Sequence, residues 1–391
     1  MIIVLFALLF LMLFGVMEQY KHNRRLERIP VRIHVNGTRG KSTTTRLIAS
    51  VLREADYVVI AKTTGSSPIL ISEDGSETQI RRHSWPRIHE QMKAIHIAAS
   101  RNANAVVLEC MAIDPEMQWI SEHKMIRSTI GVITNIREDH HDAMGSDISE
   151  MIDAITNTIP VNGHLVTSEA RYVENLRNKS AKNRSTFKHV KASDVKDHEM
   201  KLLGFETFRE NVACTIAACE HLGIDRQTIL RGLEKASQDP GVLSIYSHSI
   251  EDNLFYLINA MAANDLESLA LVWEKSQALL KRYGLIDLPT IGLFNNRSDR
   301  GQRIKEMARF ASQINALSRI VVCGQSPRLA RARMISSGVC KDRISIGRKI
   351  TSLGTLEKHL SERCIVFAFG NIKGVGLEIM NQLREKGARL C

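Results

Sequence analysis

The chain has 391 residues, of which 44% are hydrophobic and 24% are charged, and its formal net charge is +11 at pH 7. This length and apolar content allow a sizeable core, which excludes a disordered chain and predicts two globular domains. The seven cysteines form no closely spaced pairs, so a cysteine-rich metal site is excluded and a reducing compartment is indicated.

The first predicted element is an uncharged run from Ile2 to Met17. It is followed by Glu18 and then by a basic flank: Lys21, His22, Arg24, Arg25 and Arg28. A cleaved signal peptide would carry its positive charge before the run, and a buried core helix would have polar interruptions. We therefore expect residues 1–18 to anchor the chain in a membrane, although about 20 residues usually span a bilayer. The positive-inside rule places everything after Glu18 in the cytoplasm.

Residues 19–30 are predicted to form a basic juxtamembrane linker. Excess positive charge suits nucleic acid, anionic lipid or an acidic substrate. Nucleic acid is disfavoured because no helix-turn-helix, zinc-finger or aromatic-basic signature accompanies the charge. The anionic inner leaflet of the membrane accounts for the flank, where each Lys or Arg contributes about 1 kcal/mol. The remaining charge favours a polyanionic substrate.

A phosphate-binding loop is predicted between a β-like run, Val31 to Val35, and a helical pattern, Thr43 to Glu54. The usual spacing would place a glycine at Val35, so the glycine-rich turn alone is a weak signal. The Lys-Ser-Thr-Thr-Thr sequence that follows Gly40 makes the nucleotide interpretation stronger. The residues expected to contact ATP are Asn36, Gly37, Thr38, Arg39, Gly40, Lys41, Ser42 and Thr43.

Further apolar runs alternate with helical patterns, which predicts an α/β fold with a mostly parallel, helix-covered sheet. The predicted strands are 57–61, 105–110, 129–135 and 164–167, and the helices include 87–101 and 148–158. Ligands of such sheets bind beyond the carboxyl ends of the strands. The residues that directly follow each strand are therefore the candidates for chemistry.

Two of these strand ends carry candidate metal ligands. Glu109 follows one strand, and a polar segment that contains His140 follows another. A lone carboxylate is more often a capping or ion-paired residue, and a histidine-rich segment is more often a surface loop. Because both ends would converge on the phosphate loop, a magnesium shell of hydroxyl, carboxylate and imidazole groups is the stronger interpretation.

A second α/β domain is expected after a hinge at residues 238–241. Before the hinge, a helix from Glu210 to His221 has an apolar core face and carries Asn211. After it, the predicted strands and helices are 255–258, 265–282, 290–294, 303–314, 320–323 and 364–369. These patterns predict a central domain, residues 31–240, and a smaller C-terminal domain, residues 241–391.

These motifs resemble the Mur ligase superfamily, whose members are ATP-dependent amide ligases that include peptidoglycan precursor ligases and folylpolyglutamate synthase. Residues 37–45 are similar to the Gly-Thr-Asn-Gly-Lys-Thr-Thr-Thr loop of that family, which is equally short. Thr134-Asn135-Ile136 and residues 139–145 resemble its Thr-Asn-Ile and Asp-His-Leu-Asp segments. The resemblance implies a Mur-ligase-like central ATPase domain and a smaller C-terminal α/β ligase domain.

By position, the resemblance implies a catalytic set of Lys41, Glu109 and His140. Lys41 would contact the β- and γ-phosphates of ATP, while Ser42, Glu109 and His140 would hold Mg²⁺. Asn211 is similar to the asparagine that contacts adenine. Asn264 is the polar match to the Asp-Tyr-Ala-His-Asn-Pro segment and is expected to contact the nucleotide.

Three departures narrow the resemblance. Only the anchor precedes the loop, which disfavours a ligase of UDP-linked precursors. No lysine occurs between Lys124 and Lys179, where many members carry a carbamylated lysine, and Pro240-Gly241-Val242 lacks the arginine of a Pro-Gly-Arg hinge. A Mur-like core behind one membrane helix resembles the poly-γ-glutamate synthases of this superfamily.

That resemblance implies a ligase that uses ATP to add glutamate to a poly-γ-glutamate chain through an acyl phosphate. It also implies other membrane subunits for synthesis and export of the polymer. Two alternatives stay open. A folylpolyglutamate-synthase-like ligase has no evident use for an anchor, and a membrane-tethered P-loop ATPase or switch leaves Glu109 and His140 unexplained.

Overall fold

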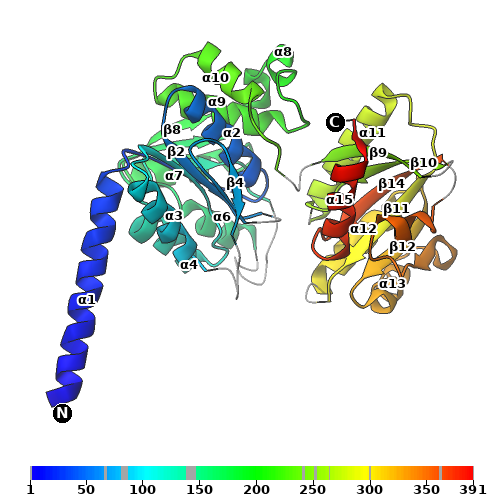
Figure 1. The fold of residues 1–391 in the computed structure, drawn as a ribbon, viewed down its shortest axis with the longest axis horizontal. Coiled ribbons are helices and arrows are strands. Elements are labelled where there is room, and N and C mark those ends of the chain that lie inside the picture. Colours follow the sequence, from blue (N-terminus) through cyan, green and yellow to red (C-terminus); the bar gives the residue numbers. More distant parts are fainter. Residues whose placement is uncertain are drawn as a thin grey trace. The chain divides into compact units, whose positions relative to one another are not determined.

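The computed structural model describes residues 2–65, 68–80, 87–137, 147–239, 243–250, 253–263, 265–298, 301–360 and 363–390. The chain divides into two compact units, Met1–Asp239 and Pro240–Cys391 (Figure 1). Each unit is a helix-covered β-sheet, so the predicted α/β fold is confirmed.

The N-terminal helix α1 spans Ile2–Glu27, so residues 19–27 continue the helix that begins in the apolar run. By length and composition, α1 is the one described helix that could cross a membrane. Its large apolar residues up to Met17 are exposed, whereas His22 and Leu26 at its end, and Ile29 just after it, are buried. The Arg32 guanidinium donates to the carbonyls of Leu26, at 3.2 Å, and Ile29, at 2.6 Å, which satisfies the end of the helix.

The first unit contains an eight-stranded sheet whose inner strands are parallel. In spatial order the strands are β4 (Glu77–Gln79), β3 (Ile69–Ile71), β2 (Val59–Thr63), β5 (Ala105–Glu109), β1 (Val31–Asn36), β6 (Ile130–Ile133), β7 (His164–Thr167) and β8 (Thr186–His189). Among the described strands of this first sheet, only the β2–β3 and β3–β4 pairs are antiparallel. This antiparallel edge was not anticipated, because β3 and β4 are too short for a clear apolar period.

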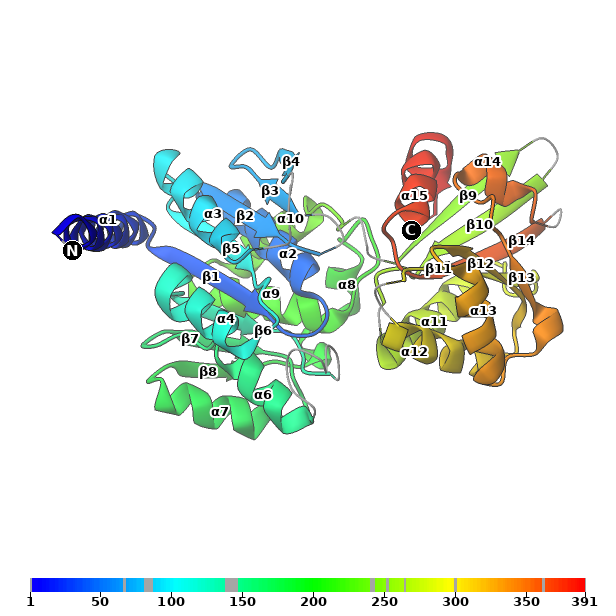
Figure 2. The same ribbon diagram turned by 90° about the horizontal axis from the view of Figure 1, so that it is seen from below.

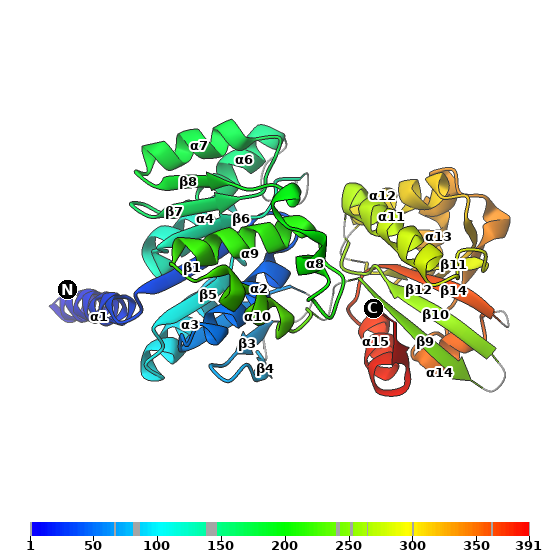
Figure 3. The ribbon, with the colours of Figure 1, turned by 90° about the horizontal axis from the view of Figure 1, so that it is seen from above.

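Helices cover both faces of this sheet (Figures 2 and 3). They are α2 (Lys41–Glu54), α3 (His89–Ser100), α4 (Pro115–Ile120), the π-helix η1 (Ser121–Ile126), α6 (Ile148–Thr156), α7 (Val173–Lys182), the 3₁₀ turn η2 (Ala192–Asp194), α8 (Asp197–Met200), α9 (Arg209–His221) and α10 (Arg226–Glu234). One core joins α2, α9 and α10 to a face of the sheet, and the opposite face packs against α3, η1, α6 and α7.

Strand β1 shows why both faces are covered. Ile33 and Val35 point into the α2 core, while the alternate residues Arg32, His34 and Asn36 point to the other face. Helix α2 presents Leu47, Ile48, Val51 and Leu52 to the sheet, which is the spacing of one apolar helical face. The phosphate loop therefore begins and ends on two well-buried elements.

The second unit contains a seven-stranded sheet. In spatial order its strands are β13 (Ile344–Ile346), β12 (Leu317–Gly324), β11 (Thr290–Asn296), β14 (Arg363–Gly370), β10 (Asn253–Asn259), β9 (Ser244–Ile250) and β15 (Ala388–Arg389). The first five run parallel, and β9 pairs antiparallel with both β10 and β15. The strand–helix alternation expected for this half therefore forms a mostly parallel sheet with an antiparallel edge.

Helices of the second unit also form two layers. They are α11 (Leu266–Arg282), α12 (Gly301–Gln313), α13 (Pro327–Ser336), the 3₁₀ turn η3 (Lys341–Arg343), α14 (Leu353–Glu357) and α15 (Val375–Lys386). One face of the sheet packs against α11, α12 and α13, and the other packs against α14 and α15. The carboxyl ends of the parallel strands lie at one edge, so loops after β11, β12, β13 and β14 meet there.

Candidate nucleotide and metal site

The phosphate loop connects β1 to α2 and depends on two glycines with positive φ. Gly37 has φ 122° and Gly40, the N-cap of α2, has φ 87°, a range that L side chains rarely adopt. A Cβ on Gly40 would overlap the side-chain oxygen of Asn211, and a Cβ on Gly37 would overlap the hydroxyl of Thr134. The loop therefore needs glycine both for its backbone angles and for its close packing.

The segment after β6 holds the loop in place. The Asn135 side chain accepts from the Arg39 N–H at 3.0 Å and donates to the Arg39 carbonyl at 2.9 Å. The Thr134 hydroxyl also donates to that carbonyl, and the Thr38 N–H donates to the Asn135 carbonyl at 2.9 Å. The Thr-Asn pair thus acts on the loop backbone, and it leaves the N-terminus of α2 at the loop, where an anion would be stabilised.

The predicted catalytic residues Lys41 and Glu109 reach the loop from different elements. The Lys41 ammonium donates to the Gly37 carbonyl at 2.6 Å, so it lies folded over the loop. Glu109, at the end of β5, accepts from the Ser42 hydroxyl at 2.9 Å and from the Thr64 N–H at 2.6 Å. The strand order β5-β1 makes this contact possible, because Glu109 pairs in register with Val35 at the carboxyl edge of the sheet.

The Ser42–Glu109 pair fits a magnesium ion. Glu109 is only 2% exposed, and no described cationic side chain forms an ion pair with it. A buried carboxylate needs a compensating charge, and hydroxyl and carboxylate oxygens are ligands for hard divalent cations. A Cβ on Gly65 would come within 2.7 Å of the Ser42 hydroxyl, so glycine keeps space open there.

Two predicted ligands lie outside the described residues, namely His140 and Asn264. Among the described residues, no third His, Cys, Asp or Glu completes a metal cluster with Glu109. Asn211 does reach the site: it is buried near the start of α9, and its side chain lies against Gly40. Thr43 is buried in the first turn of α2.

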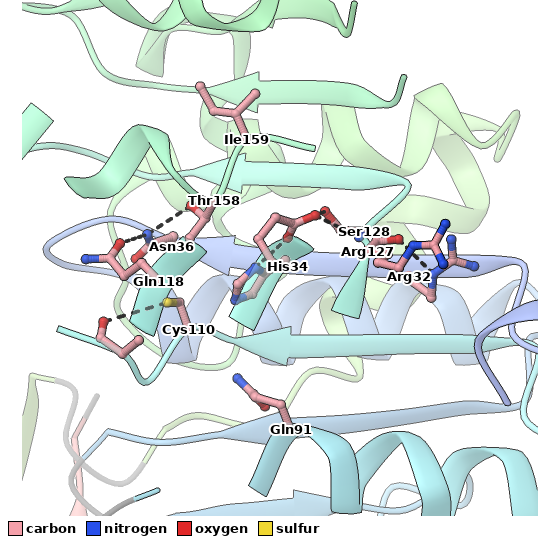
Figure 4. Close-up of polar contacts among 12 residues, drawn as sticks. Arg32, His34, Asn36, Gln91, Cys110, Gln118, Arg127, Ser128, Thr158 and Ile159 are labelled. Carbon is pink, nitrogen blue, oxygen red and sulfur yellow. Dashed lines mark hydrogen bonds and ion pairs between the residues drawn. The ribbon is translucent and has the colours of Figure 1, made fainter. Parts of the chain in front are cut away.

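The side chain of Asn36 is directed away from the loop opening (Figure 4). Its amide donates to the Gln118 side chain at 2.8 Å and to the Thr158 hydroxyl at 3.0 Å. Asn36 is 2% exposed, so it anchors the start of the loop to the helical layer behind the sheet. Its sequence position beside Gly37 did not reveal this orientation, which follows from the alternation of side chains along β1.

His34 belongs to the same buried polar layer (Figure 4). Its Nδ1 lies 2.8 Å from a carboxylate oxygen of Glu122, whose other oxygen accepts from the Ser128 N–H at 2.8 Å. Burial alone would lower the pKa of His34, but Cys110 and Glu122 offset that effect and raise the pKa to about 9. The imidazole is therefore protonated at neutral pH and compensates the charge of Glu122.

Three supporting residues were missed at the sequence level. Thr64 binds the Glu109 carboxylate through its backbone, Gln91 donates to the Glu109 carbonyl at 2.8 Å, and Gln118 holds Asn36. None has a distinctive motif, because each acts through a contact between distant parts of the chain. Their positions could be found only after the strand order was known.

Comparisons with known proteins match both units. Residues 35–224 match the Mur ligase middle domain, and residues 245–386 match the poly-gamma-glutamate synthase CapB C-terminal domain. The chain is 33% identical to the capsule biosynthesis protein CapB of Bacillus anthracis over 382 residues, which cover 96% of this chain and 81% of that protein. It is 30% identical to the PGA synthase CapB of Bacillus subtilis, with 96% and 95% of the two chains covered.

The fold is also similar to that of a folylpolyglutamate synthase. The bifunctional folylpolyglutamate synthase/dihydrofolate synthase of Yersinia pestis, solved with AMPPNP and a Mn ion, superimposes with a TM-score of 0.65. The match covers 94% of this chain and 92% of that chain at 14% sequence identity. At this identity the likeness establishes the shared fold.

Proposed function

The chain belongs to the CapB family of poly-γ-glutamate synthases, which are ligases with a Mur ligase middle domain, and we propose that it extends poly-γ-glutamate at the cytoplasmic face of a membrane. The observation that carries the proposal is the contact between Ser42 of the phosphate loop and the buried Glu109. At this contact the phosphate loop, which would hold the triphosphate, meets a carboxylate that would bind the metal. Such a pair suits phosphoryl transfer from ATP.

Amide formation at neutral pH requires an activated carboxyl group, because a carboxylate is a poor electrophile. A carboxylate oxygen of the substrate attacks the γ-phosphorus of ATP, ADP leaves, and an acyl phosphate forms. The amine of the second substrate then attacks the acyl carbon, inorganic phosphate leaves, and the amine loses a proton as the amide forms. The two substrates are glutamate and the growing poly-γ-glutamate chain.

The residues of this chain act on the phosphates. The Lys41 ammonium would leave the Gly37 carbonyl and donate to phosphate oxygens instead. The N–H groups of the loop would also donate to these oxygens. Ser42 and Glu109 would hold Mg²⁺, which neutralises charge on the phosphates when it is bound, and His140 is the proposed third ligand. Asn211 would border the nucleotide beside Gly40, and Asn264 is a further proposed contact.

The membrane assignment rests on α1. Its exposed apolar residues end where the basic flank begins, and the flank includes Lys21, Arg24, Arg25 and Arg28. The flank suits the anionic inner leaflet, and this supports a location of both units in the cytoplasm, where ATP is present. Other membrane subunits would assemble and export the polymer. The folate alternative rests on fold similarity at 14% identity, and its substrate needs no anchor.

Labelled glutamate provides the test. Membranes that contain the chain and its partner subunits should convert glutamate into acid-precipitable polymer when ATP and Mg²⁺ are added. Lys41→Ala and Glu109→Ala should each lower synthesis by about 10²-fold or more, because each removes charge stabilisation from the phosphoryl transfer. Lys93→Ala and Glu116→Ala alter exposed residues of the same types and should preserve synthesis. Near-normal polymer yield from either site variant would contradict the assignment.

A further inference from the structure

Almost the entire net charge of the chain comes from one segment of the second unit. Residues 297–349 contain 13 of the 53 lysines and arginines but only 3 of the 42 acidic residues, so they carry ten of the eleven net positive charges. This segment, here called the basic segment, forms α12, β12, α13, η3 and β13, which pack together at one side of the sheet (Figure 2).

Some arginines of the basic segment, among them Arg331 and Arg343, donate to backbone carbonyls. Arg331 donates to the Ile344 carbonyl at 3.2 Å, and Arg343 donates to the Ile314 carbonyl at 3.1 Å and to the Leu317 carbonyl. Within the described part of the chain, no acidic side chain forms an ion pair with either of them. The positive charge of Arg331 and Arg343 is therefore not neutralised by any acidic side chain in the described part of the chain.

Two further arginines line a cavity of about 360 Å³ in this segment. Arg328 lies in the first turn of α13, and Arg348 follows β13, so both stand at the carboxyl edge of the parallel strands. Both are exposed, and neither forms an ion pair with a described acidic side chain. The remaining lining comes from Gly324, Ser326 and Pro327. Two unneutralised guanidinium groups at one cavity can each bind a carboxylate through two parallel hydrogen bonds.

We propose that this cavity and the basic segment around it hold the free α-carboxylates of the poly-γ-glutamate chain, and so keep the polymer on the enzyme between additions. The inference rests on the proposed function, which supplies a polymer with one free carboxylate per residue. Charge complementarity identifies this occupant. Phe310 is the only Phe, Tyr or Trp of the segment and is 1% exposed, so the surface has no aromatic ring on which a nucleic acid base could stack.

Binding of preformed polymer tests the inference without ATP or turnover. Fluorescence anisotropy of a labelled poly-γ-glutamate oligomer is measured with the full-length chain in detergent. The double variant Arg328→Ser with Arg348→Ser should weaken binding about tenfold or more, because it removes two charge-assisted contacts. Lys182→Ser with Lys188→Ser removes the same charge from exposed positions of the first unit and should change binding less than about twofold.

Three outcomes would overturn the inference: equal weakening by the two double variants, undiminished binding of an oligomer with esterified carboxylates, or tighter binding of RNA than of polymer. Both double variants should unfold at the wild-type temperature, which excludes a folding defect. These experiments distinguish failure of the polymer-binding inference from failure of the ligase assignment. If membranes synthesise polymer but the arginine variant still binds it normally, only this inference fails; if no polymer forms, the ligase assignment fails.

Discussion

At the scale of single residues, two buried carboxylates of the first unit, Glu109 and Glu122, differ in how their charge is compensated. Glu109 is satisfied by the Ser42 hydroxyl and the Thr64 N–H, which are both neutral donors. His34 and Glu122 neutralise each other within a buried layer on the opposite face of the sheet. Glu122 therefore has a protonated partner, whereas Glu109 has only neutral donors, and this difference supports the proposed Mg²⁺ at Glu109.

The charge of His34 predicts a pH dependence of stability. Its pKa is about 9 in the folded chain and 6.5 ordinarily, so its stabilising contribution is complete below pH 6.5 and is lost as pH rises through about 9. The urea midpoint of the wild type should therefore fall over this window. His34→Gln should be less stable at pH 6.5 and should show a flatter profile. His96→Gln, at an exposed site on α3, should retain the wild-type decline; a decline of equal size in His34→Gln would contradict the assignment.

At the scale of elements, the phosphate loop is shaped by its neighbours on both sides. The loop follows strand β1 and precedes helix α2. Thr134 and Asn135, which follow β6, form hydrogen bonds with the loop backbone. Helix α9 places Asn211 against Gly40. These contacts from four elements hold the loop backbone in place, and such preorganisation reduces the entropy cost of binding a triphosphate.

Gly40→Ala tests this restriction. The substitution places a Cβ at φ 87° and against Asn211, so we expect a loss of about 1–3 kcal/mol of unfolding free energy and weaker binding of an ATP analogue. Gly204→Ala is the matched control, since a Cβ there meets no atom within 4 Å. Urea unfolding and calorimetric titration measure the two effects. Equal behaviour of both variants would show that the loop does not depend on Gly40.

At the scale of the whole molecule, α1 connects the proposed membrane anchor to the first unit without a break. The apolar run of residues 2–17 would cover about 24 Å as a helix, which is less than the hydrocarbon core of about 30 Å. The helix continues to Glu27, so basic side chains after the run can extend to the headgroups while the helix stays intact. The short run is therefore compatible with a membrane anchor.

Deletion of residues 2–17 should release the chain from membranes and preserve its fold. The buried contacts of α1 begin at His22 and continue through Leu26 and Ile29, so the docking site on the first unit remains. Membrane fractionation should find the truncated chain in the soluble fraction, and its affinity for an ATP analogue should stay within about twofold of the full chain. Retention on membranes after salt washing would contradict the anchor assignment.

Local pattern was sufficient for several conclusions. Two glycines, Lys41 and Ser42 at fixed spacing predicted the phosphate loop, and an uncharged run predicted α1, because backbone angles and hydropathy depend on neighbouring residues. Strand and helix positions followed from apolar runs of different length. The strands β3, β4, β13 and β15 did not, since each contains at most three residues, and β8 and β9 were also not predicted.

The contacts that form the candidate site could be identified only from the folded structure. The order β5-β1-β6 brings Glu109, Ser42 and Thr134 to one strand edge, although they are far apart in the chain. Alternation along β1 turns Asn36 away from the loop, and the parallel strands β12 and β13 place Arg328 and Arg348 around one cavity. Such contacts depend on strand order and side-chain direction, which one-dimensional patterns do not contain. The phosphate loop and the candidate ligand Glu109 could thus be recognised from the chain alone, whereas the contact between Ser42 and Glu109 and the proposed polymer site required the folded structure.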